Sequence, residues 1–172
     1  MPEKTSLVEL RVLAHPLRLR ILSLLTGAAM SAAEAARELR ETQANVSYHL
    51  RRLHEAGLLD VVEEVRIHGG LAKRYRHIPR DTPRWDHDDH EGEQLFASAL
   101  AGELRRRTTH RLPTGRSAVT DAEVWLDPAD WERAVQLAND LGDLLHSAAL
   151  PPRADDARRV SATIALFEME RS

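Results

Sequence analysis

The chain has 172 residues and no cysteine, and 27 acidic against 24 basic side chains give it a formal net charge of −3. This length suits one ordinary domain, or a small domain with an appended module. The absence of cysteine excludes a disulfide scaffold, a thiolate metal site and a cysteine nucleophile. No apolar run approaches the ~18 residues of a membrane span, and the first residues lack a signal peptide's apolar core. We therefore expect a soluble, cytoplasmic protein without membrane partners.

The charge is distributed unevenly along the chain. Residues 1–80 hold 13 Lys or Arg against 9 Asp or Glu, whereas residues 81–172 hold 11 against 18. A basic first part followed by an acidic second part favours a polyanion-binding module joined to a module with a different role.

Helical periodicity dominates the chain as far as Gly57. Apolar residues over 16–26 recur at helical spacing, and a shorter helix precedes them. Ser31 and Glu34 have the spacing of a capping box, in which two side chains satisfy free N–H groups at a helix start. Thr42 can cap a further helix, which Gly57 ends. Two helices joined by a tight turn are therefore predicted here.

The pattern then changes to strand-like alternation on both sides of Gly69-Gly70, which predicts a hairpin with a two-residue turn. With only these two glycines in the loop, Arg66 lies opposite Lys73 and Glu63 lies opposite Arg76. The predicted hairpin therefore has a basic tip.

The second part of the chain is predicted to contain a linker, a long helix and a β-α-β unit. Residues 81–90 have the composition of an acidic linker. The helix expected over 91–111 has an apolar stripe broader than a lone exposed helix should carry, which predicts a two-fold dimer interface. A strand over 118–126, a helix capped by Asp127-Pro128 and a strand over 160–169 follow. The expected interface residues are Leu95, Phe96, Ala99, Leu100 and Leu104.

The helix that follows Thr42 has two distinct faces. Val46, Leu50 and Leu53 recur at i, i+4 and i+7 and should point inward. The opposite face is polar without acidic residues, and it begins at a helix N-terminus, where free N–H groups favour a phosphate. Amides at this end suit adenine, and an arginine can reach a phosphate or guanine. The residues expected to meet DNA are Gln43, Ala44, Asn45, Ser47, Tyr48 and Arg51.

Three segments together resemble the winged helix-turn-helix domain of ArsR-type bacterial transcriptional regulators. They are Ala14–Leu22, Asn45–Leu53 and Glu55–Leu59, and the resemblance covers about residues 6–78. It implies a homodimer that binds a pseudo-palindromic operator in double-stranded DNA, usually as a repressor released by an inducer.

The same resemblance implies roles for individual residues. Ser47 resembles a phosphate contact of the family, and Lys73 and Arg74 resemble contacts made by the wing. The positions expected to face bases are Gln43, Ala44 and Tyr48. His49 matches a recurrent family histidine, and its place beside Val46 favours packing over contact with DNA.

The chain departs from the metal-sensing members of that family. It has no cysteine, and the helix over 31–40 offers only Glu34 and Glu38 as ligands, so arsenite-type sensing is unsupported. His87 and His90 could ligate zinc or nickel, which leaves a non-thiolate metal-sensing repressor as an alternative. We favour the simpler interpretation, a solvated acidic linker without a resident metal or cofactor.

The tail after Arg111 has three alternative roles. Its β-α-β unit can enclose an apolar small-molecule effector, with Trp125 and Trp131 in the pocket. Both tryptophans can instead pack in the core, which is the commoner place for large aromatics. In the third alternative the tail only strengthens the dimer, and DNA binding is independent of any effector.

Other classes of function find less support. The phosphate-loop, nucleophile-elbow and zinc-protease motifs are absent, so we expect no enzyme. A winged helix that binds protein would carry an acidic or apolar recognition face, and this face is neither. The predicted fold is mainly α with a small β component, an α+β arrangement. The predicted boundaries are residues 1–80 for the winged helix-turn-helix, 81–90 for the linker, and 91–172 for the dimerisation helix with its β-α-β module.

Overall fold

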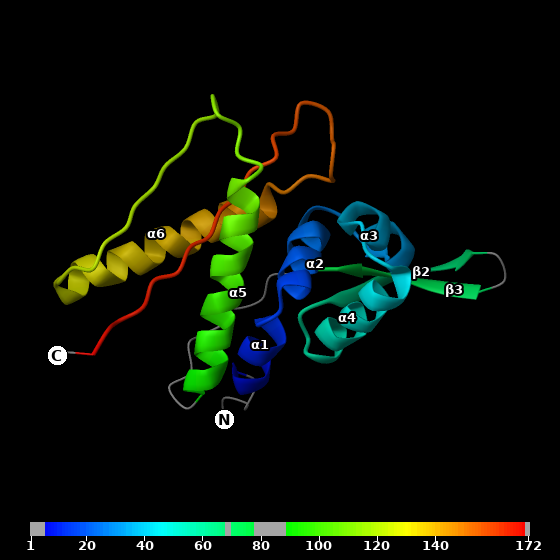
Figure 1. Cartoon of the computed structure of the whole chain (residues 1–172), viewed down its shortest axis with the longest axis horizontal. Helices are drawn as coiled ribbons and strands as arrows, with labels where there is room; N and C mark the ends of the chain where they lie inside the picture. Colours follow the sequence, from blue (N-terminus) through cyan, green and yellow to red (C-terminus); the bar gives the residue numbers. More distant parts are fainter. Residues whose placement is uncertain (1–5, 68–69, 78–88, 171–172) are drawn as a thin grey trace.

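The computed structural model describes residues 6–67, 70–77 and 89–170 (Figure 1). A helical domain with a small sheet is followed by a long helix that runs along its side, and a last helix lies beyond that one. The elements are α1 (Ser6–Leu13), α2 (Pro16–Gly27), β1 (Met30–Ser31), α3 (Ala32–Leu39), α4 (Gln43–Glu55), β2 (Asp60–Ile67), β3 (Gly70–Arg76), α5 (His90–Thr108) and α6 (Pro128–Ser147).

Helices α3 and α4 begin where their capping residues predict. The backbone N–H of Ser31 donates to the Glu34 carboxylate at 2.7 Å, and the Ser31 hydroxyl accepts from the Glu34 N–H, which completes the capping box. Helix α3 ends at Arg40, whose φ of 56° is left-handed and turns the chain sharply. The Thr42 hydroxyl then accepts from the Asn45 N–H at 3.3 Å and starts α4.

The hairpin belongs to a three-stranded antiparallel sheet with the order β1-β3-β2. Its register differs from the prediction, because Gly70 pairs with Ile67 as part of β3; residues 68 and 69 lie outside the described residues. Lys73 therefore faces Glu64 rather than Arg66, and a bulge follows Val61. Strand β1 was not predicted, since two residues are too short to show any periodicity.

The core lies where α1, α2, α3 and α4 meet the sheet. Its largest side chains are at most 1% exposed, and burying each of them stabilises the fold by ~1.5–3 kcal/mol relative to exposure. Tyr75 of β3 closes the core from the sheet side. The fully buried side chains are Leu10, Ile21, Leu25, Val46, Leu50, Leu53 and Leu59.

Helix α5 packs against α1 and α2 of its own chain. Ala99 is buried, and Phe96 and Leu100 pack against the core, whereas Leu95 and Leu104 are 48% and 46% exposed. More than half of the apolar stripe predicted to form a dimer interface is therefore covered within one chain. The rest of that stripe faces outward.

The start of α5 is fixed by Asp89, which the sequence placed in a solvated linker. Its carboxylate caps α5 by accepting from the Gly92 N–H at 3.1 Å, and it accepts two hydrogen bonds from Arg11 of α1, at 2.8 and 2.9 Å. These bonds hold the pKa of Asp89 below its usual value, and the hydrogen bonds from Arg11 are the main cause. Asp89 therefore anchors α5 to α1.

The β-α-β unit is confirmed only in its helix. Asp127 caps α6 as predicted, by accepting from the N–H groups of Ala129 and Asp130 at 2.9 Å. The predicted strands over 118–126 and 160–169 are wrong for the single chain, because both segments run without any strand assignment. A β-strand forms beside another strand, and neither segment pairs with a strand in the described part of the chain.

Candidate nucleic-acid interface

Helix α4 presents the two faces that its sequence predicts. Val46, Leu50 and Leu53 are fully buried, and His49 is 6% exposed. The outward side is exposed except for Ser47, which is half-buried, and its first turn contains no acidic residue. The exposed residues of this face are Gln43, Ala44, Asn45, Tyr48 and Arg51.

One side-chain amide at the N-terminal end of α4 has a partner within the chain. The Asn45 side chain donates to Glu41 at 3.4 Å, which draws it toward the turn between the two helices. The backbone N–H groups of the first turn retain the positive end of the helix dipole, so this end favours an anion.

A group that sequence reasoning missed lies beside this face, at the start of α2. The rings of His15 and His49 are 4.5 Å apart, and burial lowers the pKa of both, so they pack as neutral rings near pH 7. This packing explains why His49 points inward. Arg18 lies next to the pair, and its Nε is buried with no hydrogen-bond partner among the described residues.

Arg18 is close to a second cation. Burial and the nearby charge of Arg52 both lower the pKa of Arg18, although a guanidinium remains protonated at any physiological pH. Arg52 itself is exposed on α4, with Glu55 3.6 Å away. Two neighbouring cations beside Tyr48 attract an anion such as a phosphate. The sequence signal was the pair of arginines in Leu17-Arg18-Leu19-Arg20.

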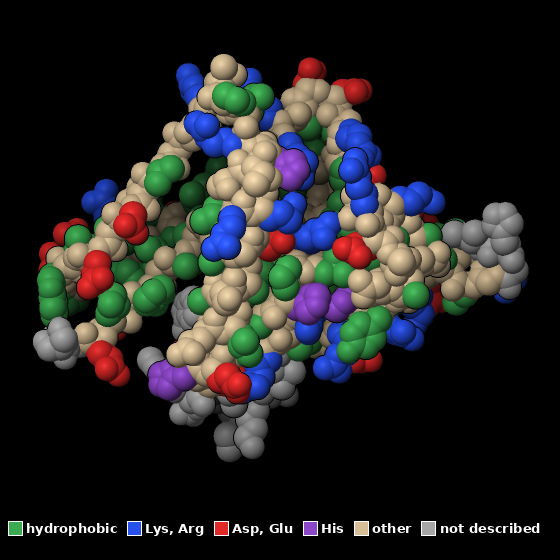
Figure 2. Space-filling view, viewed as in Figure 1, with side chains coloured by type: hydrophobic (Ala, Val, Ile, Leu, Met, Phe, Trp, Pro, Cys, Tyr) green, Lys and Arg blue, Asp and Glu red, His purple; other side chains and the backbone are tan. Residues whose placement is uncertain are grey.

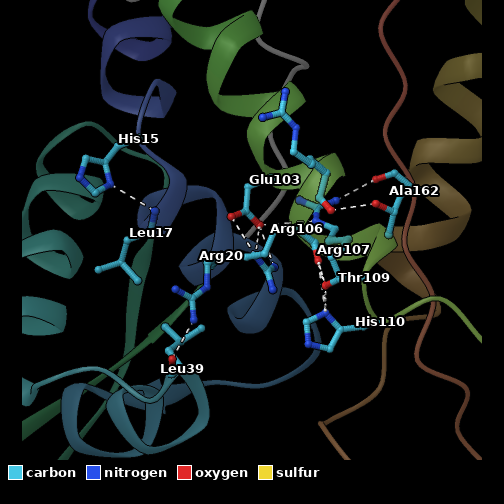
Figure 3. A network of polar contacts seen from close by, with 12 residues as sticks. His15, Leu17, Arg20, Leu39, Glu103, Arg106, Arg107, Thr109, His110 and Ala162 are labelled. Atoms are coloured by element: carbon cyan, nitrogen blue, oxygen red, sulfur yellow. Dashed lines mark hydrogen bonds and ion pairs between the residues drawn. The ribbon is translucent and has the colours of Figure 1, made fainter.

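Arg20, the other arginine of that pair, has a structural role. It donates to the Leu39 carbonyl at 2.7 Å and lies 3.4 Å from the Glu41 carboxylate (Figure 3). It thereby ties α2 to the end of α3, and it holds the turn that sets the angle between the two helices.

The two basic residues predicted for the wing lie differently. Lys73 is exposed, with its ammonium 3.9 Å from Glu64. Arg74 points inward, where it donates to the Ala29 carbonyl at 2.7 Å and lies 3.4 Å from Glu34 of the capping box. It also pairs with Glu63 of β2 at 3.3 Å. Arg74 therefore joins the wing to the start of α3, and the geometry does not present it as a free cation.

The tryptophans predicted to line an effector pocket are not brought together with the groove that the structure contains. Trp125 is 80% exposed and Trp131 is half-buried on α6. The groove, of about 180 Å³, lies between α5 and the tail and is almost wholly apolar. It is open, and it is lined by Ala97, Leu100, Ala101, Leu104, Thr163, Ala165 and Phe167.

Of the two histidines proposed as metal ligands, the structure describes only His90. His87 lies outside the described residues, and His90 is exposed on α5 with its ring 3.3 Å from Glu93. Residues 6–67, 70–77 and 89–170 contain no group of three or more His, Asp or Glu side chains arranged to hold a metal.

Comparison with known protein families gives one match. A family model described as a helix-turn-helix domain matches residues 13–62, which run from the end of α1 through α2, α3 and α4 into β2. No curated protein matches the chain. In the described part of the chain, no helix is long and apolar enough to cross a membrane. The helix-turn-helix with its antiparallel wing indicates a DNA-binding transcription regulator.

Proposed function

We propose that this protein is a homodimeric, sequence-specific transcription regulator of the ArsR type, and that it represses by occupying operator DNA. The observation that carries the proposal is the outer face of α4, whose first turn has no acidic residue, beside the Arg18 and Arg52 cations. In such a domain the second helix enters the major groove with its N-terminal residues toward the bases.

Each side chain has a role in this arrangement. Gln43, Ala44 and Tyr48 face the bases, and Asn45 completes the polar surface near the helix start. Ser47 and Arg51 contact phosphates, as do the two neighbouring cations described above. Lys73 reaches the flanking backbone from the wing, and Arg74 only positions that wing.

The proposal separates two kinds of contact that an experiment can distinguish. Phosphate contacts supply affinity for any duplex, whereas base contacts supply discrimination between sequences. A preferred duplex is first selected from a randomised pool with the full chain. Binding of that duplex and of a scrambled one is then measured by fluorescence anisotropy at several salt concentrations.

We expect Arg18→Ala to weaken binding to both duplexes and to reduce the salt slope by about one. Gln43→Ala should mainly reduce discrimination, by ~1–3 kcal/mol if its amide is bidentate to a base. Arg111→Ala, at an exposed arginine outside the proposed surface, serves as the control and should bind like wild type. If both test variants also bound like wild type, the proposed surface would be wrong.

We further propose that release from DNA is controlled through the C-terminal part by an apolar small molecule. Support comes from the apolar groove beside α5, because α5 packs directly on α1 and α2 of the DNA-binding domain. A ligand that binds one dimer geometry better than another shifts operator affinity by linkage. Titration of apolar compounds, followed by calorimetry, should show binding and release of the selected duplex together. Binding without release would leave only the dimerisation role.

A further inference from the structure

The C-terminal part of the chain has a large apolar surface without a core beneath it. No residue of α6 is buried in the described structure, and Figure 2 shows hydrophobic side chains gathered over α6 and the segments next to it. Thirteen large apolar side chains between Val119 and Met169 are 42% to 92% exposed. Their summed exposed area is ~1,000 Å², similar to what one partner contributes to a standard protein–protein interface.

Two extended segments in this part belong to no strand of the described structure. We call residues 118–126 the first arm and residues 160–169 the second arm. The first arm alternates, with Ala122, Val124 and Leu126 opposite Asp121 and Glu123, and the second arm is rich in β-branched and apolar residues. Neither forms a backbone ladder with any other described segment. Both sequences are typical of strands, and a strand forms beside another strand.

The second arm is nevertheless held in place by α5. Arg107 of α5 donates to the Ala162 carbonyl at 3.2 Å, a contact shown in Figure 3. Arg107 also lies 3.6 Å from the buried carboxylate of Glu103. Figure 1 shows the arm running beside α5, and Thr163 and Ala165 share the apolar groove with that helix. The arm is therefore presented in a defined place.

The connection that follows α6 is fixed to the DNA-binding domain as well. Arg153 pairs with Glu38 of α3 at 2.7 Å. The carbonyl of Leu150 lies against Gly27 at the end of α2, where any Cβ would overlap it. The C-terminal part is therefore attached at α5 and again at α2 and α3, while its apolar face stays open.

We infer that this face is covered by a second copy of the chain, and that the two arms of each copy become strands of a sheet shared between the subunits. The inference deepens the proposed function and rests on it for the two-fold symmetry that a palindromic operator requires. In this arrangement the exposed side of α6 and both arms, and not α5 alone, form the main dimer interface.

Two observations favour a second copy as the occupant. The summed exposed area of these apolar side chains reaches the ~800 Å² that one partner contributes to a standard stable interface. A two-fold contact also covers the same face on both copies at once.

The first test is the oligomeric state of the full chain, measured by light scattering over a concentration series. Leu137 and Leu144 are each 60% exposed on α6, and the double variant Leu137→Glu/Leu144→Glu should raise the dimer dissociation constant at least 100-fold. Asn139→Glu places the same charge on the polar side of α6 and should remain a dimer. Leu95→Glu, on the outward part of α5, should weaken the dimer less than the double variant. A dimer unaffected by the double variant, or a monomeric wild type, would overturn the inference.

The second test addresses the shared strands and remains informative if a variant misfolds. Hydrogen exchange of the wild-type dimer should be slowed at least 100-fold in both arms relative to unstructured peptide, although neither arm belongs to a strand in the described single chain. Circular dichroism and unchanged exchange in β2 and β3 check that the double variant is folded, and its arms should then exchange rapidly. Rapid exchange of the arms in a wild-type dimer would rule out the shared sheet.

DNA binding separates this inference from the proposed function. The folded monomeric variant should still bind the selected duplex, but more weakly, since its α4 face is intact. Gln43→Ala should lose discrimination and remain a dimer with protected arms. A wild-type dimer with protected arms that selected no DNA sequence would refute the proposed function and leave the shared sheet standing.

Discussion

The winged-helix part, residues 6–77, and the C-terminal part, residues 109–170, place their apolar side chains in opposite ways. In the first part, side chains such as Ile21 and Leu50 are fully buried where helices meet the sheet. In the second part, leucines of α6 at helical spacing remain exposed. The difference shows that amphipathic pattern alone does not make a core, because the apolar face must also find a partner.

The largest expected effect is on the free energy of unfolding, and it comes from truncating one leucine in each part. Leu50→Ala removes buried methyl groups from the core and should lower the free energy of unfolding by ~2–5 kcal/mol. Leu144→Ala should cost much less in the single chain and act mainly on the dimer. Urea unfolding at two protein concentrations measures both effects. Equal losses that do not depend on concentration would place Leu144 in a core of its own chain.

An effect of intermediate size is expected when an arginine that holds the fold is compared with one that faces outward, by stability and by the salt slope of DNA binding. Arg74→Ala removes the tie between the wing and the Ala29 carbonyl, so it should lower stability by ~1 kcal/mol and leave the salt slope of DNA binding unchanged. Arg51→Ala should preserve stability and reduce that slope by about one. Anisotropy titrations and urea unfolding measure the pair. The opposite result would make Arg74 a phosphate contact.

The smallest effect concerns a contact between the two parts. His77 follows β3, and its Nδ1 is hydrogen-bonded to the Thr26 hydroxyl at 3.0 Å. The centre of its ring lies 5.8 Å from that of His146 at the end of α6. Burial, with the nearby His146, lowers the pKa of His77 from 6.5 to about 4. The unfolded chain therefore takes up this proton first as the pH falls.

Stability from this group is thus fully present above pH ~6.5 and is lost as the pH falls toward ~4, by at most about 3 kcal/mol. His77→Gln should flatten that part of the curve of unfolding free energy against pH. The exposed His110→Gln is the control and should keep the wild-type slope. An unchanged slope in His77→Gln would mean that folding does not lower the pKa of this ring.

Local features with short-range causes could be predicted from the sequence. Ser31 and Glu34 fix a helix start by their own hydrogen bonds, and Asp127 does the same for α6. The inward and outward faces of α4 followed from the spacing of Val46 and Leu50. In each case the deciding contacts lie within about one helical turn.

Features set by distant contacts could not be predicted. The inward turn of Arg74 depends on the Ala29 carbonyl, and the burial of Asp89 depends on Arg11. The hairpin register shifted because Gly70 pairs in β3 instead of forming the turn. The two arms have strand-like sequences, but a strand forms beside another strand, and neither arm has one in the described part of the single chain.

Hydroxyl-radical footprinting of the full chain on the selected duplex tests the central claim most directly. Two copies joined through their C-terminal parts should present two α4 helices to one face of the DNA. The predicted footprint is two protected segments whose centres lie ~10–10.5 base pairs apart, about one helical turn. Gln43→Ala should reduce the preference for that duplex over a scrambled one. A single protected segment, or protection that does not depend on sequence, would contradict a dimeric regulator that reads DNA through α4.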